Sequence, residues 1–149
     1  MRRLWAALLA LGLGWAGATP APVHLTLFVF VKSPVSALTW DNIRARVVNL
    51  GPGAVTLELG CGAVRHRLLT AGGQDVSAFR EDVACAGSAH DVLLLPRWGT
   101  PLSGFPPEVT DLPDGRYVLE TTFEYGPWHL TRRTTVVVHK EAPSPSTLP

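Results

Sequence analysis

The sequence is poor in the residues on which several common kinds of protein depend. Its 149 positions hold two cysteines, one methionine and 17% charged residues, and the formal net charge is only +1. A protein that binds nucleic acid through its phosphates needs a strong basic excess, so no nucleic-acid partner is expected. A hydrophobic fraction of 46% also excludes a disordered polyelectrolyte.

Long apolar runs are missing after the first eighteen residues. No later stretch approaches the roughly 20 apolar residues of a bilayer crossing, so no membrane span is expected. The start of the chain has the order of a secretory signal peptide, with arginines at 2–3, an apolar run over 4–15 and small residues at 16–18. We expect cleavage after Ala18 and a secreted or periplasmic protein.

Cleavage would leave 11 basic and 12 acidic residues, a formal charge of −1. The remaining length suits one domain with a hydrophobic core and is too short for two. We expect a signal peptide at 1–18, a short linker at 19–22, a β domain at 23–140, and a disordered tail rich in proline and serine at 141–149.

Cys61 and Cys85 are the only cysteines, and an exported chain meets an oxidising environment. We expect them to form a structural disulfide, which would contribute roughly 3–4 kcal/mol by closing a loop of about 24 residues. Two buried free thiols are the alternative.

The motifs of common enzymes are also missing. The chain has no Gly-x-Ser-x-Gly, no His-Glu-x-x-His and no glycine-rich phosphate or dinucleotide loop, so we expect no catalytic residues, no cofactor and no enzyme activity. The five histidines lie in separate segments, and we expect no metal site. His66 is expected to be half-buried and bonded to the backbone.

What the chain does have is alternation of apolar and polar residues with period two, which is typical of strands. The predicted strands are Val23–Val31, Asn42–Asn49, Val55–Cys61, Val64–Leu68, Val92–Leu95, Arg116–Tyr125 and Trp128–His139. The first is apolar on much of both faces, so one of them is expected to pack on a neighbouring loop. About seven strands with regular turn signals favour an all-β fold, an immunoglobulin-like antiparallel β-sandwich.

Two turn regions refine this picture. Residues 96–113 hold five prolines, and we expect a long ordered loop or two turns there because such a run cannot form regular ladders. Asp114-Gly115 precedes Tyr117 at the start of a strong strand. We expect a structural corner in which the tyrosine hydroxyl bonds the preceding backbone, as in immunoglobulin-like sandwiches.

The chain resembles the BsuPI-type intracellular proteinase inhibitor domain, a small bacterial immunoglobulin-like sandwich. The resemblance lies in Val47-Val48-Asn49 with its Gly-Pro-Gly connection, Val55-x-Leu57-x-Leu59-Gly60-Cys61-Gly62, Val64-x-His66-x-Leu68, Gly72-Gly73 with Val76, and Leu112-Pro113-Asp114-Gly115-Arg116-Tyr117. Leu95-Pro96-Arg97-Trp98 departs from the family's usual Pro-Gly-Glu turn. The resemblance implies the sandwich fold and, as an alternative function, inhibition of an envelope or extracellular protease.

Aromatic loops are the candidates for binding a protein partner. Arg97, Trp98 and Phe105 lie in the proline-rich region, and Tyr125 and Trp128 flank the last turn. Large aromatics with arginine are typical of binding hot spots, although Trp98 and Trp128 could instead close the ends of the sandwich.

Arginines supply a second candidate surface. Arg44 and Arg46, Arg65 and Arg67, and Arg132-Arg133 could gather on adjacent strands to bind carboxylates or sulfates, or form a solvated face balanced by glutamates. We therefore expect an exported, non-catalytic binding module of unknown partner and oligomeric state.

Overall fold

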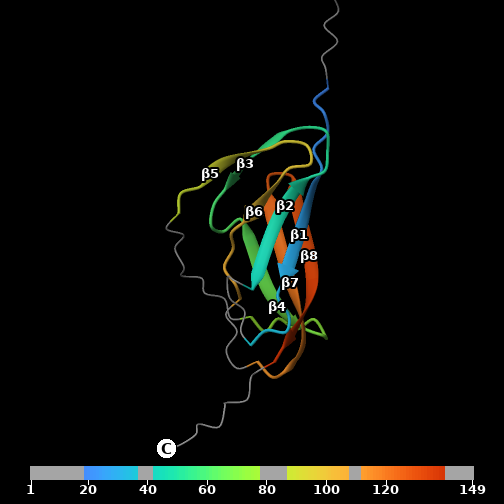
Figure 1. Cartoon of the computed structure of the whole chain (residues 1–149), viewed down its shortest axis with the longest axis vertical. Coiled ribbons are helices and arrows are strands. Elements are labelled where there is room, and N and C mark those ends of the chain that lie inside the picture. Colours follow the sequence, from blue (N-terminus) through green and yellow to red (C-terminus); the bar gives the residue numbers. More distant parts are fainter. Residues whose placement is uncertain (1–18, 37–41, 78–86, 108–111, 140–149) are drawn as a thin grey trace, which may run out of the picture.

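The computed structural model describes residues 19–36, 42–77, 87–107 and 112–139 (Figure 1). These segments form eight strands: β1 (Leu25–Val31), β2 (Ile43–Asn49), β3 (Val55–Leu59), β4 (Val64–Thr70), β5 (His90–Leu94), β6 (Gly99–Leu102), β7 (Gly115–Tyr125) and β8 (Trp128–Val138). The four segments contain no helix, and therefore none that could span a membrane. The prediction of an all-β chain is confirmed, with eight strands in place of about seven.

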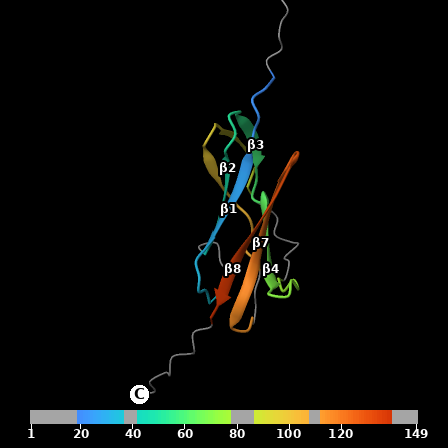
Figure 2. The ribbon, with the colours of Figure 1, turned by 90° about the vertical axis from the view of Figure 1, so that its right-hand side faces the viewer.

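The strands pair antiparallel in three small sheets, with the orders β1–β2–β6, β3–β5 and β4–β7–β8. The longest ladder is the β7–β8 hairpin, which runs from Gly115 opposite Val138 to Tyr125 opposite Trp128. Its turn at Gly126 needs a positive φ of 51°, which glycine adopts without steric cost. In Figure 2, β1 and β2 lie on one side of the molecule and β4 and β7 on the other.

Buried side chains from both three-stranded sheets share the same core. One cluster joins Leu27 and Val47 of the first sheet to Val64 and Phe123 of the second, and includes residues of β3 and β5. A second cluster brings Ile43 together with β4, β7 and β8. Alternation explains this burial, because every second residue of each strand points to the same side.

The segment after β1 crosses from the first sheet to the second. It passes through a cis peptide bond at Ser33–Pro34, and Val35 then bridges Val138 in parallel. The Val35 amide donates to the Val137 carbonyl over 2.9 Å, and the His139 amide donates to the Val35 carbonyl over 2.9 Å. The first segment of the domain is thereby attached to both sheets.

The proline-rich region differs from the expectation. Gly99–Leu102 forms strand β6 on β2, with Pro101 opposite Arg46, so the prediction of a loop without ladders is wrong here. The physical reason is the position of β6 at the rim of its sheet, where a residue without an N–H donor is tolerated.

The second face of β1 also differs from the expectation. One face of this strand was expected to pack on a neighbouring loop; Leu25 and Leu27 are buried in the core, whereas Phe28 and Phe30 on the other face are 39% and 63% exposed.

Some predicted boundaries lie outside the described residues: the signal peptide at 1–18, the tail at 141–149 and Cys85. The expected linker at 19–22 is described and has no regular structure. Its end is nevertheless held, because the Gly53 amide donates to the Pro22 carbonyl over 2.9 Å.

Candidate functional site

Large apolar side chains are exposed in two places. Phe28 and Phe30 are on β1. The others lie at the end of β2, in β5 and in the segment between β5 and β6: Leu50 (54% exposed), Leu93 (56%), Leu95 (36%) and Trp98 (61%). Leu93 and Leu95 are two residues apart in extended chain and so point to the same side. Trp98 is the largest of this second group, and we call residues 95–98 the Arg97–Trp98 turn.

The Arg97–Trp98 turn has an unusual backbone. The Trp98 amide donates to the Leu95 carbonyl over 3.0 Å, which closes a four-residue turn with Pro96 as its second residue. Arg97, the third residue, has a φ of 65°, and it is the only described residue other than glycine with a positive φ. A positive φ at the third position defines a type II turn, which usually takes glycine or asparagine there. The long arginine side chain is therefore held in a conformation that costs about 1 kcal/mol or more.

Two hydrogen bonds to β2 hold this conformation. The Arg97 amide donates to the Asn49 carbonyl over 2.7 Å, and the Asn49 amide donates to the Trp98 carbonyl over 2.9 Å. Because this exchange extends the β2–β6 ladder, the backbone beneath Trp98 is fixed while its side chain remains exposed.

The side chain of Asn49 organises the same end of the molecule. It is fully buried, and its Nδ2 donates to the Gly53 carbonyl over 2.6 Å and, more weakly, to the Leu94 carbonyl over 3.4 Å. Its Oδ1 accepts from the Gly51 amide over 3.0 Å and from the His24 amide over 3.4 Å. One buried amide thus ties the β2–β3 connection to the end of β5, from which the Arg97–Trp98 turn begins.

Two glycines of this connection have no room for a side chain. A Cβ at Gly51 would lie 2.5 Å from the Pro22 carbonyl oxygen, and one at Gly53 would lie 2.1 Å from the Ala21 carbonyl oxygen. The Gly-Pro-Gly sequence therefore lets residues 21–22 lie directly on the β2–β3 connection.

The other predicted aromatic pair is differently placed. Tyr125 and Trp128 are half-buried, stack with their ring centroids 6.2 Å apart, and pack against the core cluster that contains Phe123. The Tyr125 hydroxyl also accepts a hydrogen bond from the Glu58 amide over 3.1 Å. This pair covers the end of the core and ties the tip of the last hairpin to β3.

The remaining predicted site residues lie elsewhere. Phe105 is half-buried in the segment after β6, next to Gly104, where a Cβ would lie 2.3 Å from the Val64 carbonyl oxygen. Tyr117 is buried and donates to the Pro113 carbonyl over 2.8 Å, which is the corner contact expected of it. Asp114, just before Gly115 at the start of β7, lies 2.8 Å from His139 in an ion-pair geometry.

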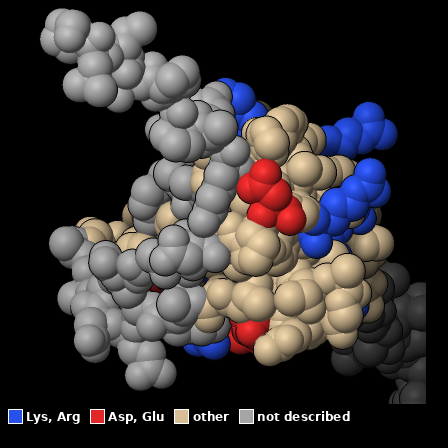
Figure 3. Space-filling view, turned by 90° about the horizontal axis from the view of Figure 1, so that it is seen from below, with Lys and Arg blue, Asp and Glu red and all other residues tan. Residues whose placement is uncertain are grey.

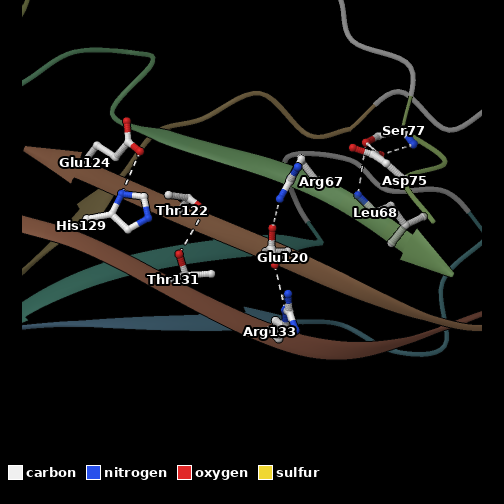
Figure 4. A network of polar contacts seen from close by, with 10 residues as sticks. All are labelled: Arg67, Leu68, Asp75, Ser77, Glu120, Thr122, Glu124, His129, Thr131 and Arg133. Carbon is white, nitrogen blue, oxygen red and sulfur yellow. Dashed lines mark hydrogen bonds and ion pairs between the residues drawn. The ribbon is translucent and has the colours of Figure 1, made fainter. Parts of the chain in front are cut away.

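The arginines are divided between two sheets and do not form one surface. Arg44 and Arg46 are on β2, whereas Arg67 and Arg133 flank Glu120 on the outer face of β4–β7–β8 (Figure 4). Hydrogen bonds from Arg67 and then Arg133 lower the pKa of Glu120, whose side chain is only 5% exposed. These three residues link three strands and are already paired with one another.

His66 is buried rather than half-buried, and its hydrogen bond within the described segments is to a side chain rather than to the backbone, so the expectation for it is wrong. Its Nδ1 shares a hydrogen bond of 2.9 Å with the Thr121 hydroxyl on the neighbouring strand β7. Burial lowers the pKa of His66 to about 4, so the imidazole is neutral at neutral pH. His66 shares the buried face of β4 with Val64 and Leu68, so its ring lies in the core, where its partner is the side chain of Thr121.

Within the described segments no cluster of three or more histidine, cysteine or acidic side chains is placed to hold a metal ion. On the surface seen in Figure 3, basic side chains project beside acidic ones, with uncharged residues between them. Comparisons with models of protein families, with curated proteins and with solved structures find no match to this chain.

Two features of the site were not identified from the sequence. The alternation places Asn49 on the buried face of its strand, but it does not indicate the four backbone partners, of which His24 and Leu94 come from distant segments. The order Leu-Pro-Arg-Trp contained a signal for a type II turn, namely proline at the second position, but arginine at the third concealed it.

Proposed function

We propose that the chain is an exported, non-catalytic binding module that contacts a protein partner through the Arg97–Trp98 turn. The observation that carries the proposal is a tryptophan with 61% exposure on a backbone fixed by two hydrogen bonds to β2. An exposed aromatic on a rigid turn loses little conformational entropy when it is buried by a partner. Tryptophan and arginine are also the residues most enriched among binding hot spots.

We propose an immunoglobulin-like β-sandwich as the arrangement of the sheets. The shared core clusters, the crossing of residues 33–36 to β8 and the hydrogen bond between Tyr117 and Pro113 support it. Nuclear Overhauser contacts between Val47 of β2 and Phe123 of β7 test this packing, and their absence contradicts two facing layers.

We also propose that Cys61, in the turn after β3, is bridged to Cys85 in the exported protein. The secretory leader and the presence of only two cysteines support this pairing. Mass spectrometry of the protein digested without reductant tests it. A linked peptide pair is expected, and labelling of both thiols by an alkylating reagent contradicts it.

Inhibition of an envelope or extracellular protease is the second candidate function. An exposed arginine on a fixed backbone favours it, since an inhibitor needs a rigid loop that resists cleavage. The turn is closed by the bond between Trp98 and Leu95, however, whereas an active-site cleft usually takes an extended segment. A protein partner that needs no extended segment is therefore the first choice.

Site-specific crosslinking tests the binding proposal. A photoreactive phenylalanine analogue at position 98 is expected to capture a discrete partner from secreted or envelope proteins, and Arg97→Ala is expected to weaken that capture. The matched control places the analogue at Thr131, which is exposed on β8. Equal capture from both positions contradicts the choice of site. Stoichiometric inhibition of a trypsin-like or subtilisin-like protease, lost in Arg97→Ala, would favour the second candidate.

A further inference from the structure

The outer face of the β1–β2–β6 sheet combines exposed aromatics with exposed arginines. Phe28 lies opposite Arg46 in the β1–β2 register, and Phe30 lies opposite Arg44. Opposed residues of an antiparallel pair lie on the same face, with Cβ atoms about 5 Å apart. All four side chains are exposed, and their alternating neighbours Leu27 and Ala45 are buried on the opposite face.

The charge of this face has one sign. The three strands contain no aspartate or glutamate, and Lys32 adds a third exposed cation just after β1. No carboxylate of the described segments pairs with Arg44 or Arg46; the one polar contact is a long bond of 3.4 Å from the Arg46 guanidinium to the Gly99 carbonyl. On the other large sheet, by contrast, Arg67 and Arg133 share Glu120.

The spacing of the two arginines matches an extended chain. Arg44 and Arg46 are two residues apart on one strand, so their Cα atoms are separated by about 7 Å. Carboxylates at alternate positions of an extended peptide repeat at the same distance. Phe28 and Phe30 beside them would contact the aliphatic stems of the acidic side chains and exclude water from the ion pairs, which strengthens the pairs.

We propose that this face, defined by Phe28, Phe30, Arg44 and Arg46, binds an extended acidic segment of a partner protein with carboxylates at alternate positions. The guanidinium groups accept the carboxylates through paired N–H donors, and the phenylalanines form the apolar border. None of these residues belongs to the Arg97–Trp98 turn, so either surface can be disproved without the other.

A fluorescein-labelled peptide of alternating glutamate and threonine, titrated against the exported protein at low salt, provides the test. Binding is expected to be at least about tenfold weaker for Arg44→Gln/Arg46→Gln, and to weaken as salt is raised. The matched control is Arg65→Gln/Arg116→Gln on the β4–β7–β8 sheet. Both arginines are exposed, and neither pairs with a carboxylate of the described segments, so their removal is expected to leave binding unchanged.

Further arms separate this proposal from general charge attraction. A peptide of the same composition with its glutamates in one block is expected to bind several-fold more weakly, and Phe30→Ser is expected to reduce binding while the melting temperature stays unchanged. The proposal is overturned if the two peptides bind equally, if both double variants lose binding equally, or if dextran sulfate binds and the alternating peptide does not.

Discussion

The Arg97–Trp98 turn and the Tyr125–Trp128 hairpin tip have similar sequences but different environments. Each combines a proline with a tryptophan next to a strand. Trp98 is 61% exposed on a backbone that is bonded to β2, whereas Trp128 stacks on Tyr125 and packs against the core. At the first place the backbone is fixed and the ring is exposed; at the second the ring packs against the core.

The difference shows that residue type alone does not separate an exposed aromatic from one that packs against the core. Trp128 is the first residue of β8, opposite Tyr125 beside the hairpin turn, and its ring packs against the core. Trp98 is the last residue of a turn whose backbone is bonded to Asn49, and its ring lies mostly in solvent. Four changes test this contrast, from the largest expected effect to the smallest.

Replacing Asn49 by leucine should have the largest effect. It leaves the Gly53 carbonyl and the Gly51 amide without their buried partner, and we expect the free energy of unfolding to fall by about 3 kcal/mol. Urea denaturation measures this loss. Leu50→Ala, at the exposed neighbouring position, serves as the control and should change stability by less than about 0.5 kcal/mol. Equal losses would show that Asn49 does not organise this end.

Lowering the pH should weaken the core beneath the hairpin tip through His66. Its pKa is about 4 in the folded chain, against an ordinary value of 6.5. The stability that comes from a neutral buried imidazole is therefore complete above pH 6.5 and is lost as the pH falls toward 4. By pH 5 the loss should be about 2 kcal/mol. Denaturation of the unchanged protein and of His66→Gln at pH 7 and at pH 5 measures this loss. An equal fall in the free energy of unfolding in both proteins would contradict the burial of His66. Hydrogen bonds from Arg67 and Arg133 lower the pKa of Glu120, so its contribution is complete above the ordinary carboxylate pKa and is lost as the pH falls from there toward the lowered one.

Removing the two tryptophans separately compares the two regions directly. Trp128→Ala exposes part of the core and should cost about 1.5 kcal/mol, less than a fully buried aromatic would. Trp98→Ala should cost less than about 0.5 kcal/mol, because its ring is mostly in solvent. Thermal unfolding of both variants checks the pair. A larger loss for Trp98→Ala would reverse the assignment of roles.

The smallest effect is a gain. Arg97→Gly relieves the positive φ and should stabilise the fold by about 0.5 to 1 kcal/mol while removing the guanidinium from the turn. Arg97→Lys keeps the strain and the charge and should leave stability unchanged. Calorimetry distinguishes the two, and a loss of stability in Arg97→Gly would mean that the arginine side chain itself supports the turn.

Local pattern was sufficient to predict most of the strands. β2, β3, β7 and β8 were predicted to within about two residues at each end, because successive residues of each strand alternate between a more buried and a more exposed face. β6 was not predicted, because proline is unfavourable inside a sheet and only the sheet order shows that β6 is an edge strand.

The candidate site was only partly accessible from the sequence. Arg97 and Trp98 were identified as loop residues suited to binding, but their composition could not separate them from Tyr125 and Trp128. The partners of Asn49 come from positions as distant as Leu94, which alternation within one strand cannot indicate. The separation of the arginines depends likewise on which strands pair.

The edge strands β6 and β8 are poorly suited to pairing with a strand from a second molecule. β6 is four residues long, and Pro101 removes an amide donor from it, while β8 places exposed Arg132 and Arg133 along its edge. Strands with these properties are poor templates for an incoming strand. At these two edges a second copy of the chain is therefore a poor partner for extending a sheet, and contacts made there depend on side chains.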